Sequence, residues 1–85
     1  MIETARKKID EIDNKLLQLL AERLEICKEL GEYKKRHNLP IKNKEREEEL
    51  LKGRTQEFKE LGFDDEIFVR ELFGLIMKKS REVQK

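Results

Sequence analysis

The feature that most constrains the fold of this chain is a heptad repeat at its N-terminal end. Counting from Ile2, nine of the first ten a and d positions are apolar. These nine are Ile2, Ala5, Ile9, Ile12, Leu16, Leu19, Ile26, Leu30 and Tyr33, and the exception is Arg23. A seam sustained over four heptads predicts one long helix that packs against another helix along most of its length.

The predicted fold class is all-α, because no segment alternates apolar and polar residues as a strand does. Three helices are expected, over residues 2–37, 43–61 and 65–84. The first break lies at Pro40, since the residue before a proline resists the helical conformation. Asn43 is expected to cap the second helix, Gly62 to end it, and Asp64 or Asp65 to cap the third.

One copy of the chain cannot cover a helix of this length. Its ~36 residues rise ~54 Å, whereas a compact globule of 85 residues is about 30 Å across. A monomer of this size is marginally stable, and Cys27, the only cysteine, cannot form an internal disulfide. We therefore expect a single domain over residues 1–85 that forms an intertwined homodimer. Gly31 is the one residue that argues against a continuous first helix, at a cost of about 1 kcal/mol.

Composition argues against several classes of function. The 20 basic and 19 acidic residues give a net charge of +1, which disfavours a nucleic-acid partner. One cysteine and one histidine are too few for a structural zinc site, and they offer no plausible nucleophilic triad. No apolar run approaches the ~18–20 residues of a membrane span, and no signal-peptide core follows Met1. A soluble, cytoplasmic protein with no membrane partner is expected.

Charged residues interrupt the apolar face of the first helix. Arg23 occupies an a position, and Lys34 lies eleven residues later, almost three whole turns, on the same face. A buried cation needs either a carboxylate partner or a ligand. Pairing with Glu22 or Glu47, snorkelling, or a register-setting role are the alternatives to a ligand site.

Polar residues also mark the other two apolar faces. Arg46 and Glu47 lie one turn before a leucine pair, so at least one faces the core side; the alternative is a solvated face. Ser80 and Gln84 continue the apolar stripe of the third helix; the alternative is a frayed polar end. Together these residues predict a cavity among helices that binds a small dicarboxylate or a phosphate. Such a site would act by orientation and electrostatics rather than covalent chemistry.

Several segments carry a family pattern, in the same order and at matching separations. They are RKKIDEID at 6–13, LLAER at 19–23, PI at 40–41, ERE at 45–47, and the set Phe73, Ile76, Ser80 and Gln84. In these segments the sequence resembles the all-helical chorismate mutase family, from Arg6 to Gln84.

The resemblance implies an isomerase that rearranges chorismate to prephenate, in the part of the shikimate pathway that leads to phenylalanine and tyrosine. It also implies an interlocked homodimer of three-helix chains with two shared active sites, and neither a metal nor an organic cofactor. Two rivals stay open: an isochorismate pyruvate lyase of the same fold, and a non-catalytic helical dimerisation or regulatory module. The carboxylate of Glu47 favours the mutase over the lyase.

The resemblance also assigns roles. The implied catalytic residues are Arg23, Lys34, Glu47 and Gln84. Arg23 and Arg6 of the partner subunit would bind substrate carboxylates. Lys34 and Gln84 would donate to the ether oxygen, and Lys34 would also donate to a carboxylate. Glu47 would accept from the substrate hydroxyl. The remaining implied substrate-binding residues are Arg46, which would set the polar environment, and Ser80, which would hydrogen-bond a carboxylate.

Two residues depart from the family pattern. Asn43 stands where members often carry an aspartate near the substrate hydroxyl. It either accepts a hydrogen bond there or only caps the second helix. Arg81 stands where an apolar residue is common, and it either faces solvent or adds positive potential to the pocket.

Overall fold

The computed structural model describes residues 1–85 as three helices with no strand. The helices are α1 (Ile2–Arg36), α2 (Lys44–Glu60) and α3 (Glu66–Gln84). Each predicted boundary lies within one residue of the observed one, so the all-α fold with three helices is confirmed. No helix combines the length and the apolar character that crossing a membrane requires.

The end of α1 follows from its local sequence. Asn38 adopts a left-handed backbone conformation with φ of 54°, and the Leu39 N–H donates to the carbonyl of Lys34 at 2.8 Å. This is the pattern by which helices commonly terminate, and Pro40 then prevents the helix from resuming. The chain therefore reverses directly after the last turn of α1 and leads back to α2.

The boundaries of α2 and α3 also have side-chain causes. Asn43 accepts a hydrogen bond from a backbone N–H in the first turn of α2, and Asp65 does the same for α3. Gly62 has φ of 102°, which suits a residue without a side chain just past a helix end. The rings of Phe58 and Phe63 stack across this turn, 5.1 Å apart. All three predicted caps are confirmed. Of Asp64 and Asp65, the two candidates for the N-cap of α3, Asp65 is the one that caps the helix.

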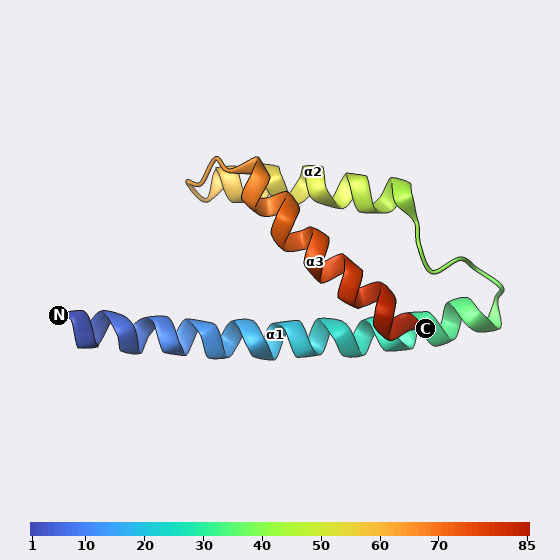
Figure 1. Ribbon diagram of the computed structural model, residues 1–85, viewed down its shortest axis with the longest axis horizontal. Coiled ribbons are helices and arrows are strands. Elements are labelled where there is room, and N and C mark those ends of the chain that lie inside the picture. The colour runs from blue at the N-terminus through green and yellow to red at the C-terminus, as the bar shows by residue number, and fades with distance from the viewer.

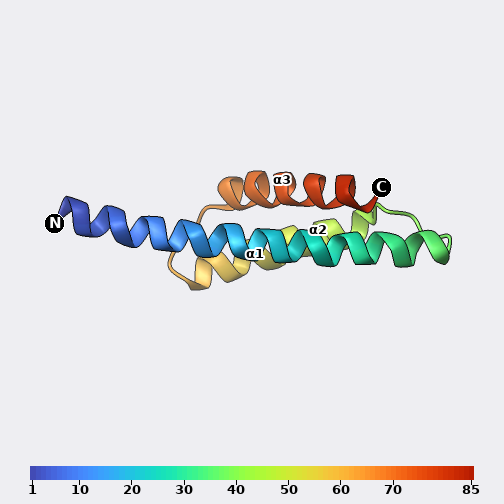
Figure 2. The same cartoon turned by 90° about the horizontal axis from the view of Figure 1, so that it is seen from below.

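Helix α3 lies between the other two and packs against both (Figure 1). It crosses from the end of α2 back to the C-terminal half of α1, where its last residues lie against that helix. The N-terminal part of α1 extends beyond the other helices in both views (Figure 2). The molecule is accordingly elongated, at 54 × 24 × 16 Å.

The chain buries very few residues. They are Gly31, Leu50, Val69, Met77 and Ser80. Most of the predicted seam of α1 is instead exposed, for example Ile9 at 54% and Leu19 at 62%. No helix of the same chain covers most of this apolar seam, as was predicted from the length of the first helix.

Candidate functional site

A polar cavity of about 190 Å³ lies where α1, the start of α2 and the end of α3 come together. Seven of the eight predicted site residues line it: Arg23, Lys34, Asn43, Arg46, Glu47, Ser80 and Gln84. The remaining wall is formed by Cys27, Leu30, Ile41, Leu50, Met77 and Arg81. The structure thus brings together residues that lie up to 61 positions apart in the sequence.

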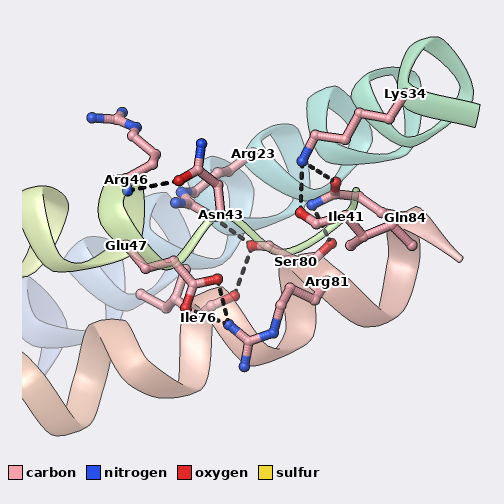
Figure 3. Close-up of polar contacts among 10 residues, drawn as sticks. All are labelled: Arg23, Lys34, Ile41, Asn43, Arg46, Glu47, Ile76, Ser80, Arg81 and Gln84. Atoms are coloured by element: carbon pink, nitrogen blue, oxygen red, sulfur yellow. Dashed lines mark hydrogen bonds and ion pairs between the residues drawn. The ribbon is translucent and has the colours of Figure 1, made fainter. Parts of the chain in front are cut away.

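Lys34 and Gln84 meet at one end of this cavity (Figure 3). The Lys34 ammonium donates to the side-chain oxygen of Gln84 at 2.9 Å and to the backbone carbonyl of Ile41 at 2.7 Å. The amide nitrogen of Gln84 donates to the carbonyl of Ser80 at 3.0 Å. Because an ammonium has three N–H donors and an amide has two, each side chain keeps one donor for a ligand.

Gly31 makes this pairing possible. A side-chain carbon built on Gly31 would lie 2.6 Å from the Cα and the carbonyl oxygen of Gln84. Only a glycine lets the end of α3 approach α1 so closely. The residue that argued against a continuous helix therefore has a packing role, and α1 passes through it unbroken.

Arg23 projects from α1 into the cavity and contacts α3. Its guanidinium donates to the hydroxyl of Ser80, and that hydroxyl donates to the backbone carbonyl of Ile76 at 2.7 Å. Arg23 has no carboxylate within ion-pair distance. The alternative in which Glu22 or Glu47 neutralises it is therefore wrong.

Glu47 is paired instead with Arg81. One guanidinium nitrogen of Arg81 donates to both carboxylate oxygens of Glu47, at 2.7 Å each. The two side chains, at 27% and 22% exposure, are partly shielded from water. Of the two alternatives for Arg81, facing solvent is wrong: its side chain forms part of the cavity wall. This pairing was not predicted from the sequence. The signal that could have indicated it is the position of Arg81, a cation directly after Ser80 at the polar end of α3.

Arg46 and Asn43 lie at the mouth of the cavity. Both residues are exposed, and the Arg46 guanidinium points away from the other labelled side chains (Figure 3). The side-chain oxygen of Asn43 accepts from the Arg46 backbone N–H at 3.0 Å. Asn43 thus caps α2 and borders the cavity at once, and its amide N–H groups are the part left for a ligand.

Arg6, the eighth predicted residue, is absent from this cavity. It lies 17 residues before Arg23 on the same helix, about 25 Å along the axis. Arg6 is exposed on the part of α1 that extends beyond the other two helices. It cannot reach the cavity of its own chain.

The cavity carries four cations and one carboxylate, and only Arg81 and Glu47 form an ion pair. Arg23, Lys34 and Arg46 retain their charges without an anionic partner, and the hydrogen bonds of the first two go to neutral groups. Unpaired cations in a partly enclosed site attract anions, and guanidinium groups bind carboxylates with two parallel hydrogen bonds. The arrangement suits a ligand with two carboxylates and a further oxygen near Lys34 and Gln84.

Comparison with known proteins agrees with this chemistry. The family model described as "Chorismate mutase type II" matches residues 5–85. A chorismate mutase from Methanocaldococcus jannaschii is 38% identical over 80 residues, which cover 94% of this chain and 80% of that protein. A T-protein from Enterobacter agglomerans is 40% identical over 75 residues, 88% of this chain, but the match spans only 20% of that longer protein.

A solved structure has the same fold. A conserved hypothetical protein from Pyrococcus furiosus superposes with a TM-score of 0.79 at 42% sequence identity. The superposition covers 99% of this chain and 95% of the other. The three-helix arrangement with a long first helix is therefore shared with a protein of known structure.

Proposed function

This chain belongs to the chorismate mutase type II family, and we propose that the cavity between its helices is where the substrate is rearranged. Its activity is that of an isomerase of aromatic amino acid biosynthesis acting on chorismate. The observation that carries the proposal is that two cations without a carboxylate partner, Arg23 and Lys34, share one cavity with Gln84 and Glu47. The reaction, chorismate to prephenate, is pericyclic and needs no covalent intermediate.

The cations hold the substrate. Arg23 uses one N–H on Ser80 and keeps most of its donors for a carboxylate. The positive charge of Lys34 attracts a second carboxylate, whereas its one spare N–H is kept for the ether oxygen. Arg46 adds positive charge at the mouth of the cavity. Fixing both carboxylates favours the compact conformer in which the enolpyruvyl arm lies over the ring.

Lys34 and Gln84 stabilise the transition state. As the C–O bond breaks, negative charge develops on the ether oxygen. The spare N–H groups of these two residues would donate to that oxygen, and donors already held in place stabilise developing charge without reorganisation. Glu47 accepts a hydrogen bond from the substrate hydroxyl, which orients the ring, while Asn43 contributes its amide group next to the helix cap.

A second copy of the chain completes the site. The exposed seam of α1 and the few buried residues support an intertwined homodimer of single-domain chains. In such a dimer, Arg6 of the partner subunit would reach the cavity that its own chain cannot reach. The cytoplasmic location expected from the sequence stays a prediction.

Among the alternatives, the non-catalytic module predicted an internally paired Arg23 and a filled cavity. Arg23 has no carboxylate partner, and no side chain of the chain fills the cavity of about 190 Å³. No observation favours the isochorismate pyruvate lyase over the mutase.

The direct test follows the loss of chorismate by ultraviolet absorbance and identifies the product. Prephenate is expected from the folded protein; its absence would refute the function. Salicylate and pyruvate formed from isochorismate would instead support the lyase.

The shared site is tested by mixing two variants. Arg6→Ala and Arg23→Ala proteins should each be inactive. After subunit exchange, about a quarter of wild-type activity should return, because half of randomly exchanged dimers carry one intact site of two. No recovery after confirmed exchange would contradict a site built from two chains.

A further inference from the structure

The pairing of Arg81 with Glu47 is the only ion pair in the cavity. It joins α3 to α2, and one nitrogen of Arg81 contacts both carboxylate oxygens. A carboxylate offers about four acceptor positions. Arg81 approaches from α3 and occupies two of them, so the remaining positions of Glu47 are free for a donor inside the cavity.

The other cations of the cavity contact neutral groups alone. Arg23 donates to the hydroxyl of Ser80, and Lys34 donates to a backbone carbonyl and an amide oxygen. Glu47 lies in the same cavity as these cations. A carboxylate that lies among several cations pairs with one of them. The cation in that pair then attracts a ligand carboxylate less strongly.

We propose that Arg81 is a positioning residue that serves as the dedicated counter-ion of Glu47. By holding the Glu47 carboxylate on the α3 side, it leaves Arg23, Lys34 and Arg46 to the two carboxylates of the substrate. The four cations and one carboxylate of the cavity give it a net charge of +3. This inference rests on the proposed function, since it takes a dicarboxylate as the ligand.

A structural role is the competing explanation, because Arg81 also links two helices. The chain supplies a matched control. Arg70 and Glu48 link the same two helices, with nitrogen–oxygen distances of 3.0 and 3.4 Å, and neither residue lines the cavity. Loss of the Arg70 pair should affect stability without touching substrate binding.

The test compares Arg81→Met with Arg70→Met in the chorismate assay, with circular dichroism and oligomeric state measured alongside. In R81M the freed carboxylate competes with the substrate, so KM should rise about tenfold, equivalent to ~1.4 kcal/mol, while kcat changes less than about threefold. R70M should keep the wild-type KM. If R81M does not fold, Arg81→Gln replaces it, since a glutamine can still hydrogen-bond between the helices without the charge.

The decisive variant is the double substitution Arg81→Met with Glu47→Gln. The uncharged amide that Glu47→Gln introduces cannot compete for cations. Because Glu47 itself contacts the substrate, the reference is Glu47→Gln alone, and adding Arg81→Met to it should change KM by less than about threefold. Arg81→Lys, which keeps the charge, should hold KM within about threefold of the wild type. A KM for R81M equal to that of R70M, or a tenfold rise in KM when Arg81→Met is added to Glu47→Gln, would overturn the counter-ion role. Inactive wild-type protein would instead refute the proposed function.

Discussion

Substituting Gly31 with alanine tests how the end of α3 is held in the site. The added carbon would lie 2.6 Å from the Cα and carbonyl oxygen of Gln84 and 2.9 Å from its Cβ. Ordinary contacts of this kind are 3.4–4 Å. Since the atoms it meets belong mainly to the backbone, no flexible side chain can turn away. The end of α3 must move by about 1 Å.

The effect on activity should exceed the effect on stability. Overpacking costs about 1–3 kcal/mol, but alanine gains about 1 kcal/mol over glycine within a helix, so stability falls by about 0–2 kcal/mol. A shift of about 1 Å would stretch the 2.9 Å hydrogen bond between Lys34 and Gln84 beyond a useful length. A misplacement of this size can lower kcat/KM about 100-fold.

The assay measures kcat/KM for chorismate together with the thermal midpoint. Gly53→Ala is the matched control, because a carbon there meets only the Glu57 carboxylate at 3.9 Å. It should leave activity unchanged and raise stability by about 0.5–1 kcal/mol. In a Gln84→Ala background, Gly31→Ala should lower kcat/KM by far less than in the wild type. Wild-type kcat/KM in the single variant Gly31→Ala would refute the reasoning.

Three further outcomes are expected. Lys34→Ala should lower kcat by about 100- to 1000-fold with unchanged helicity by circular dichroism, and near-normal turnover would remove Lys34 from the site. Ile12→Asp, on the exposed seam, should shift the proposed dimer toward monomer in light scattering, and an unchanged mass would argue against that interface. Arg70 donates to Glu48 and lowers the pKa of that carboxyl below its ordinary 4.5. The folded state thus binds this proton less tightly, so the stabilisation is complete above the ordinary pKa and is lost as pH falls through the lowered one. Glu48→Gln should therefore lower the thermal midpoint near pH 6 but by less near pH 3, and equal losses at both pH values would contradict the pairing.

The sequence predicted what depends on neighbours along the chain. The predicted helix ends rested on Pro40, Asn43 and Gly62, whose effects extend over only a few residues. The polar residues of the site could be identified because they interrupt apolar faces and because they match a family pattern. These signals required no knowledge of how the helices cross.

What could not be predicted depends on that crossing. Arg81 and Glu47 are 34 residues apart, and only the relative placement of α2 and α3 makes them partners rather than Glu47 and Arg23. Gly31 similarly looked like a cost to its helix, because the chain end that packs on it lies 53 positions later. Sequence patterns report which face a residue is on, but not which distant residue shares that face.

In the proposed homodimer, α1 would couple dimerisation to catalysis. The helix carries the exposed seam, and it also carries Arg6 and Arg23, about 25 Å apart. A rigid helix cannot bring both residues to one small ligand. Each proposed site would therefore need Arg23 from one chain and Arg6 from its partner. Separating the subunits would then expose the seam and remove a substrate-binding cation at once. This arrangement would explain why one chain buries so few residues. Helix α1 of the partner subunit would complete both the core and the site.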